Sequence, residues 1–173
     1  RLGYWPNISH NKEVAMGDPF QDVDSAGQEF AEATARTMEI RQSEPVMEKI
    51  VNDYLIELEF TANRPAIEIG CGPGAISRRI ARHAKGTQVI GFDPSSNYIE
   101  MACNQSGSLS NLEFQVFDGE KIPLNDGKAQ NVIMHTVLSH VIDPCQLISE
   151  AYRVLGNGGK FVICDADFSK ATL

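Results

Sequence analysis

Two zones with different patterns of apolar residues divide the chain. From residue 64 onward, short apolar runs alternate with amphipathic stretches of helix length. This alternation is typical of a doubly wound, mainly parallel sheet with helices on both faces. Up to residue 63, apolar residues recur at helical spacing instead. We therefore predict one structural domain of the α/β class, made of an N-terminal arm and helical cap (residues 1–63) and a sheet core (residues 64–173).

Five apolar runs in the second zone predict the strands of the sheet. They cover residues 66–69, 88–92, 112–117, 131–134 and 160–164. Helices fill the gaps, and the clearest one spans residues 144–155, with Asp143 as its N-cap and Gly156 as its terminator. The dipeptide Gly158-Gly159 then predicts a turn that leads into the fifth strand.

Two helices are expected in the cap. Ser25 and Gln28 fit an S-x-x-Q capping box, in which the two side chains satisfy free N–H groups of the first helical turn. Pro45 suits the first turn of a second helix, because its fixed φ is already helical. One face of that second helix carries an apolar stripe, and the stripe needs a partner surface. Its residues are Met47, Ile50, Val51, Tyr54, Leu55 and Leu58.

The net charge and the cysteines limit the kinds of substrate, metal site and cellular location that we expect for this chain. A net charge of -8 disfavours a nucleic-acid substrate, because proteins hold a phosphate backbone mainly with Lys and Arg, so small molecules are favoured. No apolar run approaches the roughly 20 residues that span a bilayer. The cysteines form no C-x-x-C pair and have no His at ligand spacing, so we expect no metal site, no disulfide framework and a cytoplasmic location. They are Cys71, Cys103, Cys145 and Cys164.

A glycine-rich loop, E-I-G-C-G-P-G, follows the first expected strand at residues 68–74. Glycines let the backbone turn tightly and approach a ligand closely. A helix that opens near Ala75 would aim free N–H groups at that ligand. The loop alone is ambiguous, because Gly70, Gly72 and Ala75 also fit the G-x-G-x-x-A fingerprint of dinucleotide-binding oxidoreductases.

Acidic residues end the next two expected strands. Asp93 can accept hydrogen bonds from both hydroxyls of a ribose, and Asp118 can accept one from the amino group of an adenine. The structural alternatives are an N-cap for Asp93 and a turn residue for Asp118. The glycine loop, Asp93 and Asp118 follow three successive strands, and this combination favours a nucleotide site over these alternatives.

The motifs resemble, in order, those of class I S-adenosylmethionine-dependent methyltransferases. They are E-I-G-C-G-P-G, V-I-G-F-D-P-S, F-D-G-E-K-I-P, H-V-I-D-P and R-V-L-G-N-G-G-K. The resemblance spans Tyr4 to about Asp167 and is closest to the small-molecule branch, which includes quinone-biosynthesis and cyclopropane-synthase-like enzymes. It implies a Rossmann-like core, S-adenosylmethionine as cofactor and S-adenosylhomocysteine as product.

The same resemblance implies a set of cofactor contacts. The glycines would cradle the methionine part, Asp93 would bind the ribose, Asp118 with Gly119 would bind the adenine, and Glu68 would support the loop from below. Tyr4 and Trp5 would close over the cofactor, or else anchor the N-terminal arm. The full set is Glu68, Gly70, Cys71, Gly72, Gly74, Asp93, Pro94, Asp118, Gly119, Tyr4 and Trp5.

Methyl transfer from a sulfonium is an in-line displacement of an activated leaving group, so the protein chiefly positions the reactants and excludes water. A general base is needed only when the acceptor atom carries a proton. His135 and His140, which flank the end of the fourth expected strand, are the candidates for that role. For His140 the alternative is a structural residue that packs against the following helix.

This sequence departs from the family at two places. Asn131 stands where the family usually has Asp. The family's sheet continues past strand five to an antiparallel hairpin, whereas this sequence ends at Leu173. The fifth strand is apolar on both faces and would form an exposed edge. We expect the sequence to be incomplete at this edge, or a partner chain, such as a second copy, to cover it.

Two other functions compete with methyl transfer to a small-molecule acceptor. One is a NAD(P)-dependent oxidoreductase, against which stand Gly74, Glu68 directly before the glycines and the helical preamble of about 60 residues, since dinucleotide domains usually open with the glycine strand. The other is a non-catalytic relative that keeps the fold as an interaction module.

Overall fold

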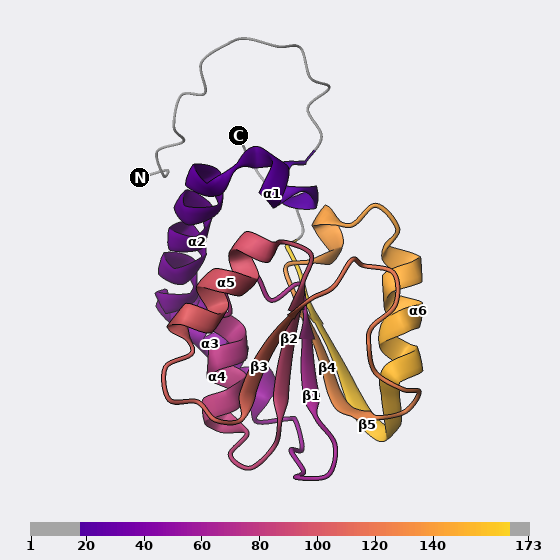
Figure 1. Ribbon diagram of the computed structural model, residues 1–173. Coiled ribbons are helices and arrows are strands. Elements are labelled where there is room, and N and C mark those ends of the chain that lie inside the picture. Colours follow the sequence, from indigo (N-terminus) through magenta and orange to yellow (C-terminus); the bar gives the residue numbers. More distant parts are fainter. Residues whose placement is uncertain (1–17, 167–173) are drawn as a thin grey trace.

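A parallel sheet forms the centre of the computed structural model, which describes residues 18–166. Within these residues the sheet has five strands in the order β3-β2-β1-β4-β5 (Figure 1). All neighbouring strands pair in parallel. The chain builds outward from β1 on one side and then returns to build β4 and β5 on the other, so the strand order reverses beside β1. The strands are β1 Ala66–Ile69, β2 Val89–Asp93, β3 Leu112–Val116, β4 Ala129–His135 and β5 Leu155–Cys164.

Helices cover both faces of the sheet, as predicted for a doubly wound α/β fold. Figure 1 shows α6 on one side of the sheet and α3, α4 and α5 on the other, with α1 above the carboxyl edge of the strands. The helical elements are η1 Pro19–Gln21, α1 Val23–Ala26, α2 Gln28–Ser43, α3 Pro45–Leu55, α4 Ala75–His83, α5 Ser96–Gln105, η2 Leu138–His140 and α6 Pro144–Val154.

Alternate residues of each central strand enter different cores. Ile67, Phe92 and Val132 pack in the cluster that includes Leu147 and Val154 of α6. Their neighbours along the strands enter a second cluster with residues of α3 and α4, because successive side chains of a strand point to opposite faces. The members of this second cluster are Val51, Leu55, Leu58, Ala66, Ile76, Ile80, Ala81, Ala84, Val89 and Ile133. The apolar stripe of α3 thus finds its partner surface on α4 and the sheet.

The capping box expected at Ser25 and Gln28 is wrong. Asp22 caps α1 instead, since its side chain accepts a hydrogen bond from the backbone N–H of Ser25 at 3.1 Å. Gly27, with a φ of 92°, then separates α1 from α2, and α2 starts at Gln28 without a side-chain cap. An aspartate three residues before Ser25 is a strong competing N-cap, and the two sequence signals were not separable by spacing alone.

The turn expected at Gly158-Gly159 and the terminator role of Gly156 are also wrong, because β5 already begins at Leu155. A Cβ on Gly156 would lie 2.6 Å from the carbonyl oxygen of Gly127, and one on Gly159 would lie 2.5 Å from that of Gln130. Glycine is therefore required here because β5 closely approaches the backbone of β4 and of Gly127, which lies just before β4. The register between β4 and β5 shifts between Ala129 and Asn131.

β5 lies at the edge of the sheet in the described part of the chain, as expected. Its Ile163 is 46% exposed. Coverage of this edge by further strands or by a partner chain stays a prediction. Among the helices of residues 18–166, none is long and apolar enough to cross a membrane.

Candidate functional site

The glycine loop joins β1 to α4 at the carboxyl edge of the sheet, where the strand order reverses. Gly70, Gly72 and Gly74 have φ values of 72°, 52° and 83°, a region that side chains rarely permit. A Cβ on Gly70 would lie 2.6 Å from Val137 Cγ2, and one on Gly74 would lie 2.6 Å from Phe114 Cζ. These glycines are therefore fixed both by backbone conformation and by close neighbours.

Every backbone N–H that the loop possesses has a partner within the protein. The N–H groups of Gly70 and Cys71 donate to the carbonyl oxygen of Phe92, at 2.7 and 3.0 Å, and that of Gly74 donates to Cys71 at 3.0 Å. The N–H of Gly72 donates to Oδ2 of Asp93 at 2.8 Å. Residue 73 is proline and has no N–H. The loop therefore retains no free backbone donor for a ligand.

Asp93 is buried at the end of β2 and joins the loop to the next helix. Its Oδ1 accepts a hydrogen bond from the backbone N–H of Ser95 at 2.9 Å, while Oδ2 accepts from Gly72. Burial raises the pKa of Asp93 to about 6, although these two hydrogen bonds oppose the shift. Each oxygen can accept a further hydrogen bond. The N-cap alternative is wrong, because Ser95 caps α5 by accepting from the N–H of Tyr98.

Glu68 lies in β1 with only 1% of its surface exposed, beneath the loop. The hydroxyl of Ser77, in α4, donates a hydrogen bond to its carboxyl group. Burial raises the pKa of Glu68 to about 8, and the hydrogen bond from Ser77 opposes this shift. Glu68 is therefore mainly protonated at neutral pH and links β1 to the helix that follows the loop.

Asp118 and Gly119 lie in an exposed segment after β3. The side chain of Asp118 accepts a hydrogen bond from the backbone N–H of Glu120 at 2.9 Å, and Gly119 has a φ of 88°. The turn alternative for Asp118 therefore describes its contact in the structure. The carboxylate remains exposed and can accept further hydrogen bonds.

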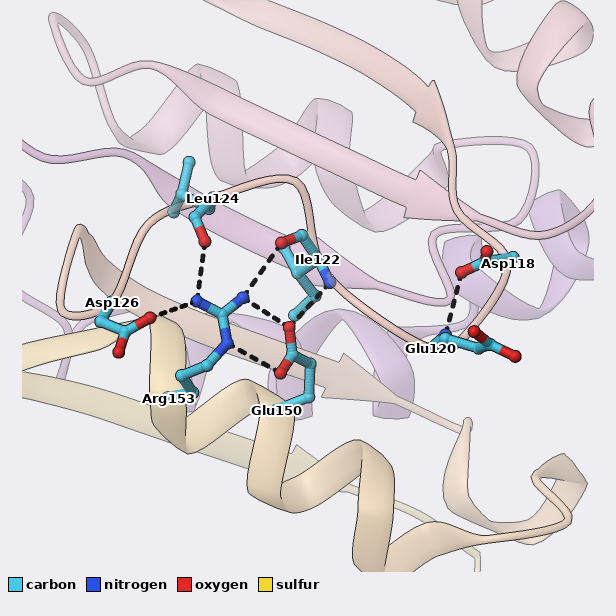
Figure 2. A network of polar contacts seen from close by, with 7 residues as sticks. All are labelled: Asp118, Glu120, Ile122, Leu124, Asp126, Glu150 and Arg153. Atoms are coloured by element: carbon cyan, nitrogen blue, oxygen red, sulfur yellow. Dashed lines mark hydrogen bonds and ion pairs between the residues drawn. The ribbon is translucent and has the colours of Figure 1, made fainter.

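An arginine on α6 fastens the segment that carries Asp118, as Figure 2 shows. Arg153 donates to the carbonyl oxygens of Ile122 and Leu124 at 3.0 and 2.9 Å. It also pairs with Glu150 and with Asp126, at 2.5 and 2.6 Å. Glu150 accepts in turn from the N–H of Ile122 at 2.8 Å, and the hydrogen bond from Arg153 lowers the pKa of Glu150. The R-V-L motif was recognisable in the sequence, but this role of its arginine was not.

His135 ends β4 and is buried. Its Nδ1 lies 3.4 Å from the hydroxyl of Tyr54, and its Nε2 has no partner among the described residues. Burial lowers the pKa of His135 to about 4, and the charge of Arg41 acts in the same direction. The imidazole is therefore neutral at physiological pH.

His140 contacts residues at the N-terminal end of the described chain, and its packing against the following helix, the structural alternative, stays a prediction. Its Nδ1 lies 2.5 Å from Oδ2 of Asp18, and its ring lies 4.9 Å from that of Phe20, between centroids. Asp18 is separated from His140 by 122 residues. No sequence signal pointed to this pair.

A second carboxylate of the cap contacts the start of α5, next to Asp93. Asp24 accepts hydrogen bonds from the hydroxyl of Ser95 at 2.5 Å and from the backbone and hydroxyl of Ser96 at 2.8 and 2.6 Å. Burial alone would raise the pKa of Asp24, but these hydrogen bonds lower it to about 2. Pro94 and Ser95 line a cavity of about 60 Å³ together with residues 20–24. No pattern in the sequence pointed to Asp24 either.

Two further expectations concern Asn131, which pairs with Ala66 at the amino end of the sheet, and two residues of the N-terminal arm. Asn131 is buried in β4, and its Nδ2 donates to the carbonyl oxygen of Glu59 at 2.8 Å. Its Oδ1 has no partner within residues 18–166. Tyr4 and Trp5, which were expected to close over the cofactor or to anchor the arm, lie outside the described residues.

Comparison with known families connects this geometry to an enzyme class. Residues 67–163, which run from β1 to β5 and make up more than half of the chain, match the family model described as "Methyltransferase domain". The chain belongs to this methyltransferase family. The matched span contains the glycine loop, Asp93, Asp118 and both histidine candidates.

Two individual relatives are similar to the chain, and one of them is named as a methyltransferase. The chain is 32% identical, over 169 residues, to an uncharacterised 37.1 kDa protein in transposon TN4556 of Streptomyces fradiae, covering 86% of this chain and 49% of the relative. It is 30% identical to the demethylmenaquinone methyltransferase of Tropheryma whipplei over 108 residues, covering 62% and 44%. The chain thus spans about half the length of these relatives.

A solved structure shows the same fold. A putative S-adenosylmethionine-dependent methyltransferase of Methanococcus maripaludis superimposes with a TM-score of 0.68 at 23% identity, covering 91% of this chain and 67% of that one. The expected Rossmann-like, class I methyltransferase fold is therefore confirmed.

Proposed function

We propose that this methyltransferase domain binds S-adenosylmethionine at the carboxyl edge of its sheet and supports methyl transfer to a small-molecule acceptor. One observation carries the proposal beyond family membership: the glycine loop keeps its own N–H groups paired and holds the carboxylate of Asp93 beside Gly72. The residues of the loop itself thus present acceptors of hydrogen bonds, and the uncapped start of α4 supplies the N–H donors at this edge.

This property argues against the dinucleotide alternative. A diphosphate is bound by the N–H groups of a glycine loop together with those of the following helix N-terminus, and its negative charge is repelled by nearby carboxylates. In this protein only the helix N-terminus keeps such donors, because the N–H groups of the loop are paired. Here the N–H of Gly72 already donates to Asp93, and Asp24 occupies the start of the neighbouring helix. A ligand with ribose hydroxyls and a positive sulfonium, but no phosphate, fits this set of groups.

The residues around the glycine loop divide the contacts with the cofactor among them. The three glycines leave room for the methionine part, the free lone pairs of Asp93 accept hydrogen bonds from the ribose, and Asp118 with Gly119 contacts the adenine. Cys71, Pro94 and Glu68 shape and support the loop. When bound, the cofactor supplies a methyl group on an activated sulfonium, so the protein has to orient the acceptor and exclude water.

Of the two histidine candidates, His140 is the better proton acceptor. Its Nδ1 faces the carboxylate of Asp18, which would fix the tautomer and leave Nε2 free to receive a proton. His135 is a weak base at neutral pH because its pKa is low. We assign His135 to polar contact with the acceptor in its neutral form.

The net charge of the chain and its similarity to one relative support the class of methyl acceptor that we propose. The net charge of -8 favours a small molecule over a nucleic acid. The similarity to a demethylmenaquinone methyltransferase makes hydroquinones the first acceptors to test. A hydroquinone carries a proton that must leave during methylation, which matches the proposed task of His140.

Ligand binding tests the proposal directly. The full chain is titrated by calorimetry and by thermal shift with S-adenosylmethionine, S-adenosylhomocysteine and NAD. At 100 times its dissociation constant, a ligand adds about 2.7 kcal/mol to the free energy of unfolding. We expect both sulfur compounds to stabilise the protein and NAD to have no effect. Stabilisation by NAD alone would refute the proposal in favour of an oxidoreductase, and no stabilisation by any of the three would favour a non-catalytic module.

A further inference from the structure

The turn after β4 has an unusual backbone. Thr136 has a φ of 56°, and it is the only non-glycine residue with a positive φ in residues 18–166. A β-branched residue avoids this conformation, so the surrounding contacts must hold it in place. One such contact is the hydrogen bond from the N–H of Thr136 to the carbonyl oxygen of Cys164 at 2.7 Å.

Asp165, the residue after β5, holds the rest of this turn. Its Oδ2 accepts hydrogen bonds from three successive backbone N–H groups, those of Val137, Leu138 and Ser139, at 3.1, 2.8 and 3.3 Å. Its Oδ1 accepts from the hydroxyl of Ser139 at 3.1 Å. Partial burial would raise the pKa of Asp165, but the hydrogen bonds lower it below its usual range. The carboxylate is therefore charged, and it binds the turn as an anion in a nest of N–H groups.

The turn held by Asp165 carries two elements of the proposed site. The side chain of Val137 is buried against the first glycine of the loop, since a Cβ on Gly70 would lie 2.6 Å from its Cγ2. At the other end of the turn, η2 carries His140, whose ring contacts Asp18. A shift of the turn would therefore move both Val137, which packs against Gly70 of the loop, and His140.

We propose that Asp165 is a positioning residue. It fixes the positions of the glycine loop and of His140 relative to each other and does not touch the cofactor. The inference rests on the cofactor site proposed above and adds a residue that lies 95 positions after Gly70 in the sequence. Val137 transmits the effect by packing, because a close-packed contact on a glycine leaves no room for independent movement.

A matched pair of variants tests the inference. Asp165→Ala removes the carboxylate that holds the turn, and Asp143→Ala removes another capping carboxylate, which accepts from the N–H of Gln146 at the start of α6. Both are expected to lower the melting temperature. Only Asp165→Ala is expected to weaken binding of S-adenosylhomocysteine in calorimetry, by about tenfold. Asp165→Asn keeps one acceptor oxygen and should show an intermediate loss, and it replaces Asp165→Ala if that variant does not fold.

Hydrogen exchange gives a second readout that needs no cofactor. In Asp165→Ala, the amides of Gly70 and Gly72 should exchange faster, whereas Asp143→Ala should leave them unchanged. Equal affinity and equal exchange at the loop in the two variants would overturn the inference and leave Asp165 a purely structural cap. If wild-type protein binds no cofactor, the proposed function fails, and the exchange rates alone decide whether Asp165 positions the loop.

Discussion

The carboxylate of Asp93 accepts a hydrogen bond from the backbone of Gly72 at 2.8 Å, although the two residues are 21 positions apart. This contact joins the end of β2 to the loop after β1. It turns two sequence motifs into one site, and it makes Asp93 both a part of the loop and its candidate ribose ligand.

Asp93→Asn should therefore weaken cofactor binding. The amide keeps the shape of the side chain but offers one acceptor oxygen for two N–H partners, and it cannot accept both ribose hydroxyls. We expect the affinity for S-adenosylhomocysteine to fall at least tenfold, or about 1.4 kcal/mol, in calorimetry. Glu100→Gln, at an exposed position of α5, is the control and should bind as wild type. An Asp93→Asn protein with wild-type affinity would remove Asp93 from the site.

Glu68 predicts a particular dependence of stability on pH. Its pKa is about 8 in the folded protein, against 4.5 without burial. A raised carboxyl pKa means that the folded state holds its proton to higher pH than the unfolded state. The contribution of Glu68 to the free energy of unfolding should therefore fall as the pH rises from about 4.5 to 8.

Glu68→Gln should remove this dependence. The amide oxygen can still accept from Ser77, and no charge has to be buried at basic pH. Urea unfolding at several pH values should show the variant more stable than wild type at pH 8, by at least about 1 kcal/mol, and similar to it at pH 5. A difference in stability between the variant and wild type that does not grow from pH 5 to pH 8 would contradict the assignment of a protonated Glu68.

His140→Ala should lower the rate of methyl transfer to hydroquinones by about 10² to 10⁴. Calorimetry with S-adenosylhomocysteine should find the cofactor affinity unchanged, because a proton acceptor is not needed for binding. His83→Ala, at the exposed end of α4, should leave both quantities unchanged. If His140→Ala keeps its full rate, the acceptor reacts without this base.

Arg153→Met should destabilise the protein by about 2–3 kcal/mol in chemical denaturation. The substitution removes the guanidinium donors shown in Figure 2 from the carbonyl oxygens of Ile122 and Leu124 and from Glu150, which keeps only the N–H of Ile122. Lys49→Met is the matched control, because its ion pair with Asp53 is exposed and worth at most about 1 kcal/mol. Equal losses from both substitutions would show that the α6 contact does not hold the segment after β3.

The sheet and the outline of the site were predictable because they depend on local patterns. Apolar runs located the five strands of the described residues, although β5 begins at Leu155, five residues before its expected start, and strand ends placed the glycine loop beside Asp93. Two local signals led to wrong predictions, one of a helix cap and one of a turn. An aspartate outcompeted Ser25 as the helix cap, and Gly158-Gly159 reflects close strand packing rather than a turn.

Contacts between distant residues were not predictable. Asp18 with His140, Asp24 with Ser95 and Asp165 with the turn after β4 join segments whose separation in the chain carries no periodic signal. Each of these carboxylates looks like an ordinary surface acid in the sequence. Only the folded arrangement shows which of them faces a hydrogen-bond donor.

The paired N–H groups of the glycine loop also bear on how binding energy is used. A loop whose N–H groups already have partners gains no hydrogen bonds by rearranging when a ligand binds. Its conformational entropy is therefore lost during folding and not during binding. The free protein should therefore present the same loop shape as the complex, and the affinity for the cofactor is then set by the contacts made rather than by a conformational change.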